Sequence, residues 1–228
     1  MYYYGNNLYY LLTIVMLVVS LICSGVVKSR FNRYAKERPR NGMTGAMAAQ
    51  RILHANGIHD VQIQPIGGSL TDNYDPTAKT LNLSQTVYGE SSVSAVAVAA
   101  HECGHAIQHA TAYPLLMLRK SLVPICNIGS YGSYIAILAG IFLQKSGLIL
   151  FGALLFSGIV LFNLVTLPVE VDASRRAMAE VERLNLLTDE EKAGGRKVLF
   201  AAGMTYFISL VSSIIQLLRL LSLANRRR

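Results

Sequence analysis

The sequence predicts a mainly α-helical membrane protein, with about four transmembrane helices and a small α+β unit exposed to water. Composition is the first observation: 52% of the 228 residues are hydrophobic and only 15% are charged, whereas an ordinary soluble domain carries roughly a quarter charged residues. Second, apolar residues gather in four long stretches that contain no charged residue or histidine. Third, the polar remainder, residues 41–114 and 169–197, has helical and alternating patterns of its own.

Each apolar stretch is long enough to cross a membrane as a helix. The hydrocarbon core is about 30 Å thick and a helix rises about 1.5 Å per residue, so a span needs about 20 apolar residues. The first stretch predicts an uncleaved anchor, because no basic residue precedes it and its apolar run is too long for a signal peptide. The predicted spans are Leu8–Val27, Leu122–Gln144, Leu148–Leu167 and Val198–Leu218.

Basic residues beside these spans predict the orientation in the membrane. Residues 28–40 contain six Lys and Arg residues and one acid, and cytoplasmic loops carry such an excess of basic residues. We therefore expect a multi-pass protein of the cell inner membrane, with the N-terminus outside and the polar unit on the cytoplasmic side. A fourth complete crossing would leave the basic tail, residues 226–228, outside. The last helix therefore dips in and returns, lies partly in the interface, or carries this tail outside.

Cysteine content and charge exclude two classes of protein. Three cysteines with no Cys-x-x-Cys pair exclude a disulfide framework and a cysteine-rich zinc module. The net charge of +8 does not predict a nucleic-acid partner, because the basic residues lie at the ends of spans and lack interleaved aromatic residues. The lipid bilayer is the expected partner, and a second membrane protein or another copy of the chain could accompany it.

The polar regions predict a few short elements between the spans. Apolar residues at spacings of three and four predict a helix over Gly45–His54. Alternation predicts strands over 61–66 and 80–84, which a turn at 72–76 would join into a short β-ribbon. A further helix begins near Val93, capped by Ser91 or Ser92, and runs to His109 or beyond. The expected divisions are an anchor (1–27), an α+β region (28–121), a transmembrane hairpin (122–168), a second cytoplasmic segment (169–197) and a final membrane helix with its tail (198–228).

The helix predicted to begin near Val93 carries an H-E-x-x-H pattern, His101-Glu102-Cys103-Gly104-His105. Histidines four residues apart lie on one face of a helix, so both rings can bind one metal ion. Zinc suits imidazole and leaves a position for water in catalytic sites. Glu102 cannot reach that ion, but it can take a proton from the water and return it to a leaving amine. The pattern predicts a catalytic Zn²⁺ site with His101 and His105 as ligands.

A third ligand is needed, because zinc in hydrolases usually takes three protein ligands. No further histidine follows at the metzincin spacing, whereas Glu170 and Asp172 come directly after the third span. We favour Glu170 as the ligand and expect Asp172 to accept a hydrogen bond from a ligand histidine. The alternative is an acid–base cluster in which either carboxylate pairs with Arg175 or Arg176.

Several runs resemble the bacterial membrane-bound neutral zinc metallopeptidases, the YugP-like family. The resemblance covers nearly the whole chain and implies a gluzincin-like zinc peptidase unit, in which Glu170 is the third ligand. Two positions depart from the pattern: Ser174 stands where related membrane peptidases carry Asp, and Asn73 stands where we expect His. The runs are 70–76, 83–88, 95–108 and 168–177, and Thr205-Tyr206 fits the last motif of the family.

These features together predict a zinc-dependent metalloendopeptidase at the inner face of a membrane. Its substrate would be a membrane-associated peptide or protein that binds as an extra strand beside the ribbon. Tyr74, Asn73 and Arg175 are candidates for stabilising the oxyanion. Two alternatives remain open: a protease that cleaves inside the membrane, and a non-catalytic membrane scaffold in which zinc only stabilises the cytoplasmic unit.

Overall fold

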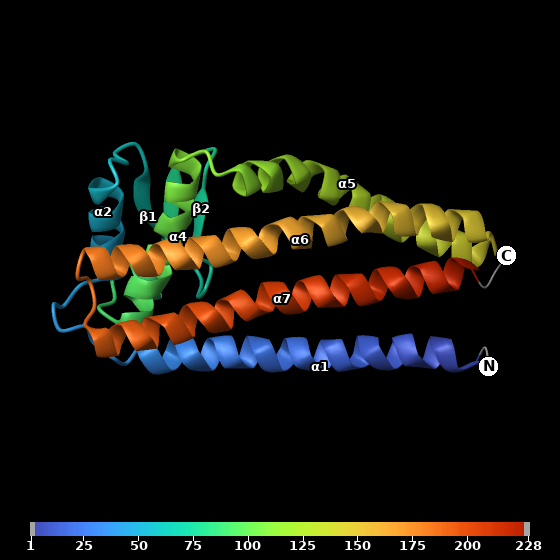
Figure 1. The fold of residues 1–228 in the computed structure, drawn as a ribbon, viewed down its shortest axis with the longest axis horizontal. Helices are drawn as coiled ribbons and strands as arrows, with labels where there is room; N and C mark the ends of the chain where they lie inside the picture. The colour runs from blue at the N-terminus through green and yellow to red at the C-terminus, as the bar shows by residue number, and fades with distance from the viewer. Residues whose placement is uncertain (1–2, 226–228) are drawn as a thin grey trace. The chain divides into compact units, whose positions relative to one another are not determined.

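A computed structural model describes residues 3–225, so the basic tail at 226–228 lies outside the described residues. The chain divides into two compact units. One comprises Met1–Ile22, Met117–Pro168 and Thr205–Arg228, and the other comprises Cys23–Leu116 and Val169–Met204. The elements in order are α1 (Tyr3–Tyr34), α2 (Gly45–Ala55), β1 (Gln62–Ile66), β2 (Asn73–Asp75), β3 (Thr80–Ser84), α3 (Gln85–Tyr88), α4 (Val93–Ala110), α5 (Pro114–Phe142), α6 (Ser146–Arg183) and α7 (Asp189–Asn225) (Figure 1).

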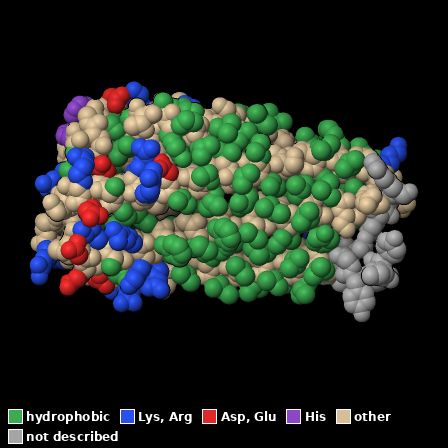
Figure 2. Space-filling model, in the orientation of Figure 1, with side chains coloured by type: hydrophobic (Ala, Val, Ile, Leu, Met, Phe, Trp, Pro, Cys, Tyr) green, Lys and Arg blue, Asp and Glu red, His purple; other side chains and the backbone are tan. Residues whose placement is uncertain are grey.

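The first unit is built from α1, α5, α6 and α7, each long and apolar enough to cross a membrane. Its surface exposes large apolar side chains; Phe142 is 93% exposed and Ile128 is 77% exposed. Figure 2 shows hydrophobic side chains covering the visible face of the long helices. Because exposed apolar area of this extent is unfavourable in water, these surfaces suit contact with lipid. The four predicted spans are confirmed as four apolar helices.

Close contacts hold the helices of this unit together. The hydroxyl of Ser133 on α5 donates a hydrogen bond to the carbonyl of Gly152 on α6 at 2.9 Å. The guanidinium of Arg219 lies 4.3 Å from the ring centroid of Tyr10, so the last part of α7 runs beside the first part of α1. Since α7 is one continuous helix from Asp189 to Asn225, it excludes the alternative in which the last helix dips into the membrane and returns.

The second unit contains a three-stranded sheet, and the predicted two-stranded ribbon is wrong in its pairing. β1 and β3 are parallel, and β2 lies at the edge, antiparallel to β3. The turn falls later than predicted, because the Asp75 carboxylate accepts hydrogen bonds from the backbone N–H groups of Thr77 and Ala78. The chain between β1 and β3 therefore forms β2 and then reverses. It enters β3 in the same direction as β1.

Helix caps explain why both predicted helices of this unit form where expected. Thr44 accepts a hydrogen bond from the N–H of Met47 at the start of α2, and Ser92 accepts one from Ala95 at the start of α4. Such caps satisfy backbone donors that have no partner in the helix. α2 ends at Ala55 and is followed by Asn56 and then by Gly57, which has φ +69°. The core between these helices and the sheet includes the fully buried residues Ile52, Leu81, Leu83, Val87 and Val96.

α6 and α7 each contribute a segment to the second unit, residues 169–183 and 189–204. Ala177 and Val181 of α6 and Val198 of α7 belong to the same core cluster as α4. A β-carbon added at Gly195 would lie 3.3 Å from the β-carbon of Ala97, so α7 packs closely on α4. The shared core also places α6 beside α4, the helix that carries the two spaced histidines.

Candidate metal centre

A close approach between α4 and α6 positions the site. A β-carbon added at Gly104 would lie 2.4 Å from the carbonyl oxygen of Ala173, a separation that real structures do not show. Glycine at this position therefore lets the two helices come together. His101 and His105 flank Gly104 on α4, and Glu170 lies three residues before Ala173 on α6. The side chains of both helices consequently meet at one place.

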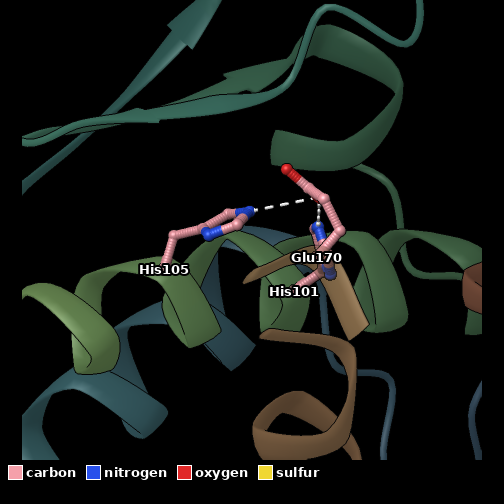
Figure 3. Close-up of side chains that lie close together, drawn as sticks. All are labelled: His101, His105 and Glu170. Carbon is pink, nitrogen blue, oxygen red and sulfur yellow. Dashed lines mark hydrogen bonds and ion pairs between the residues drawn. The ribbon is translucent and has the colours of Figure 1, made fainter. Parts of the chain in front are cut away.

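His101, His105 and Glu170 form a group whose donor atoms all lie within 4.8 Å of one another. One oxygen of Glu170, Oε2, is 3.2 Å from Nε2 of His101 and 3.5 Å from Nε2 of His105. Figure 3 shows both rings directed toward this carboxylate. Donor atoms around a tetrahedral zinc ion, each about 2.0–2.2 Å from the metal, lie about 3.3 Å apart. The two distances to the Glu170 oxygen are close to this spacing, so two imidazole nitrogens and a carboxylate oxygen form a donor set that suits a zinc ion.

Glu102 is buried beside the trio, with 7% of its surface exposed. Burial raises the pKa of its carboxyl group above the ordinary value, and the two neighbouring histidines oppose that rise. A carboxylate with a raised pKa is a better acceptor of a proton from water. Burial alone would lower the pKa of His105, but the hydrogen bond and charge of Glu170 outweigh it, so the net pKa is raised.

A buried hydrogen-bond network lies behind His105. Its Nδ1 is 3.1 Å from Oε1 of Gln108, and Nε2 of Gln108 donates to the Val169 carbonyl and to Asp172, both at 2.9 Å. Asp172 also accepts hydrogen bonds from Arg175 and Arg176. The predicted direct hydrogen bond from a ligand histidine to Asp172 is therefore wrong: Asp172 pairs with the two arginines and reaches His105 through Gln108. The sequence analysis did not identify Gln108; its only local signal is the three-residue spacing from His105 on the helix.

His101 has a different partner behind it. Its Nδ1 is 3.1 Å from the hydroxyl of Ser174, which lies one helical turn after Glu170 on α6. Ser174 occupies the position where related membrane peptidases carry Asp. A neutral hydroxyl therefore occupies the place beside His101 where a carboxylate was anticipated.

The three oxyanion candidates are bonded to other groups. The hydroxyl of Tyr74 lies 2.9 Å from Nδ1 of His109, and burial, reinforced by the charges of Asp60 and Asp75, raises the pKa of Tyr74 to about 12. Asn73 donates to the backbone of Thr71 and accepts from Asn82. Arg175 pairs with Asp172. Only Tyr74 bonds to α4, which ties edge strand β2 to the last turn of that helix.

A cavity of about 310 Å³ lies elsewhere in the second unit, between α2 and β1. His54 and His59 are among its lining residues, with their ring centroids 5.2 Å apart. None of the residues of the trio lines this cavity. The cavity is therefore separate from the candidate metal centre.

Comparison with known proteins agrees with the motifs. The family described as "Putative neutral zinc metallopeptidase" matches residues 9–225. The chain is 42% identical over 212 residues to "Putative membrane protease YugP" of Bacillus subtilis (strain 168). The alignment covers 93% of this chain and 94% of that protein. No solved structure matches the chain. The family resemblance is thereby confirmed.

Proposed function

Because the chain belongs to the family of neutral zinc metallopeptidases, we propose that it is a membrane-embedded zinc endopeptidase that hydrolyses peptide bonds at the membrane surface. The observation that carries this proposal is the convergence of His101, His105 and Glu170, whose donor atoms lie within 4.8 Å of one another. These side chains come from two helices, 65 or more residues apart in the sequence. Such a meeting does not follow from the H-E-x-x-H pattern alone.

These three residues would hold a zinc ion. When bound, zinc polarises the scissile carbonyl and lowers the pKa of a water molecule to about 7. Glu102, buried beside the ligands, takes the proton from this water and then gives it to the leaving amine. The hydroxyl of Tyr74, whose raised pKa keeps it neutral, is hydrogen-bonded to His109 near the last turn of α4. Donation to the carbonyl oxygen of the substrate would require it to leave His109.

The edge strand offers a way to orient a peptide. β2 pairs with β3 on one side within the described part of the chain. Its other side faces no strand there, and Tyr74 links it to α4. An extended substrate that adds to this edge would be held by main-chain hydrogen bonds. We propose that the substrate is a membrane-associated protein and that the site lies on the cytoplasmic side of the inner membrane.

Two observations favour this function over the alternatives. A structural zinc site normally has four protein ligands, whereas the candidate group contains three among the described residues, which would leave a position for water. The trio also lies in the second unit, where polar and charged residues gather, and not among the apolar segments of the first (Figure 2). These features support hydrolysis at the membrane surface over a scaffold or cleavage within the bilayer.

Replacement of Glu102 by Gln tests the proposed function. Glu102→Gln keeps the shape of the side chain but removes the group that accepts the proton. We expect casein hydrolysis by the detergent-purified protein to fall by about 100-fold or more, while zinc content stays near one ion per chain. Proteolysis would be measured by release of labelled peptides, and zinc by elemental analysis.

Each outcome of this experiment has a distinct meaning. Wild-type protein that binds no zinc would contradict the metal site. A zinc-loaded wild type that cleaves no protein would favour the scaffold. Unchanged turnover in the Glu102→Gln variant would remove this carboxylate from the mechanism.

A further inference from the structure

Gln108 is a fully buried amide at the junction of α4 and α6. Its nitrogen contacts two acceptors on α6, the carbonyl oxygen of Val169 and the carboxylate of Asp172, both at 2.9 Å. Its oxygen contacts Nδ1 of His105 at 3.1 Å. Every polar atom of the Gln108 side chain therefore has a partner, and no water is needed to complete the network.

The chemistry of these partners fixes the direction of the amide. A backbone carbonyl can only accept hydrogen bonds, and an ionised carboxylate can only accept them too. Both oxygens of Asp172 also accept hydrogen bonds from the guanidinium groups of Arg175 and Arg176. Both hydrogens of the Gln108 amide are thus required by Val169 and Asp172. The amide oxygen must then face His105.

That direction determines where His105 holds its proton. An amide oxygen has no hydrogen to donate, so Nδ1 of His105 must be the donor in this contact. Nε2, which faces Glu170 at 3.5 Å, then has its lone pair free for a metal ion whenever the ring is neutral. If the ring is an imidazolium, Nδ1 still carries a proton, and the contact with Gln108 is unchanged.

We propose that Gln108 is a positioning residue that locks His105 in the tautomer that binds metal through Nε2. This inference rests on the proposed function, since it assigns a role at the same metal centre. It gives the two ligand histidines different degrees of preorganisation. A buried acceptor holds His105, whereas His101 contacts the hydroxyl of Ser174, which can donate or accept and so does not fix a tautomer.

Asp172 contributes through Gln108. Its negative charge lies on the nitrogen side of the amide and favours the orientation in which the oxygen points to His105. Hydrogen-bonded partners behind a metal-binding histidine typically change metal affinity by about 10–100-fold. Neither ligand histidine contacts a carboxylate through Nδ1. Nδ1 of His101 contacts the hydroxyl of Ser174, and Nδ1 of His105 contacts the amide oxygen of Gln108.

Gln108→Met is the test variant, because methionine has a similar length but cannot form these hydrogen bonds. Zinc affinity would be measured by competition with a chromogenic chelator on purified, metal-stripped full-length protein. We expect about 10–100-fold weaker zinc binding. Ser174→Ala, which removes the partner of the other ligand histidine, is the matched control and should cause a smaller loss. Thermal unfolding of the metal-free proteins would show how much each change affects folding itself.

A spectroscopic measurement reads the tautomer directly. In a long-range ¹H–¹⁵N spectrum of metal-free protein labelled at its five histidines, we expect His105 to carry a proton on Nδ1. Its signal would be assigned by its loss in His105→Gln. In Gln108→Met, the share of the neutral ring with its proton on Nε2 should increase. A merely structural role for Gln108 would leave this distribution unchanged.

The outcomes separate this inference from the proposed function. Wild-type protein without zinc affinity would overturn the metal centre, whereas normal zinc affinity in a folded Gln108→Met variant would overturn only the role of Gln108. If this variant fails to fold, the wild-type spectrum decides. With the spectrum recorded at a pH at which the ring is neutral, a His105 protonated solely on Nε2 would contradict the proposal, and a neutral ring protonated on Nδ1 would support it.

Discussion

Glu170 is a buried carboxylate with 2% of its surface exposed, set between two imidazole rings. Burying an unpaired charge is costly, so such a group needs a cation or hydrogen-bond donors. The neighbouring rings can supply donors without metal, and a divalent ion could replace them. At the scale of single residues, therefore, the site combines a fixed negative charge with two nitrogens that can each hold either a proton or a metal ion.

Glu170→Gln is expected to remove most zinc binding, because the amide keeps the shape but loses the charge that attracts the ion. We expect the zinc affinity to fall by more than about 100-fold, beyond the range seen for partners that do not touch the metal. Chelator competition would measure it. Glu182→Gln is the matched control on α6, because Glu182 pairs with Arg196 and is 61% exposed. Equal zinc affinity in wild type and Glu170→Gln would exclude Glu170 as a ligand.

At the scale of elements, the site depends on how closely α4 and α6 approach. Helix α4 could be predicted from its sequence because its signals are local: a serine cap, apolar periodicity and two histidines one turn apart. The sheet could not be predicted in the same way. The predicted strands at 61–66 and 80–84 agree closely with β1 and β3, but their parallel pairing depends on β2, which occupies part of the predicted turn.

Gly104→Ala should separate α4 from α6. The added β-carbon would lie 2.4 Å from the Ala173 carbonyl oxygen, and such overpacking typically costs about 1–3 kcal/mol. We expect a lower unfolding temperature together with weaker zinc binding, measured by thermal unfolding and chelator competition.

Gly203→Ala is the control for this change, since an added β-carbon at Gly203 on α7 meets nothing within 4 Å. Alanine there should leave zinc binding unchanged and could slightly favour the helix. If Gly104→Ala also binds zinc like the wild type, close approach of the two helices is not what positions the ligands.

At the scale of the whole molecule, zinc and folding should be linked. The ligands come from α4 and α6, so the complete group exists only in the folded chain. An ion that binds only the folded state stabilises it by about 4 kcal/mol when its concentration is 1,000 times Kd. Chelation should therefore lower the unfolding temperature of the purified protein, and added zinc should restore it. The same treatment should have little effect on Glu170→Gln; an equal shift in that variant would indicate binding elsewhere.

The orientation of the protein in the membrane is open to a direct test. The basic residues at 28–40 predict that the turn around Lys145 faces outward and that Glu90 faces the cytoplasm. We expect a membrane-impermeant maleimide to label Lys145→Cys in intact cells and Glu90→Cys only after permeabilisation. Both variants would carry Cys23→Ser, because Cys103 and Cys126 are buried and Cys23 is half-buried. The reverse labelling pattern would place the metal centre outside.

The sequence by itself determined the four apolar helices, the position of α4 and the two histidines on one of its faces. These features follow from local periodicity, spacing and caps, which depend on residues a few positions apart. Only the tertiary structure decided that Glu170 meets both rings, that Gln108 connects His105 to Asp172, and that β2 forms the edge of the sheet. Those relations join segments far apart in the chain. They depend on how closely the helices pack, which at Gly104 is set by the absence of a β-carbon opposite the Ala173 backbone.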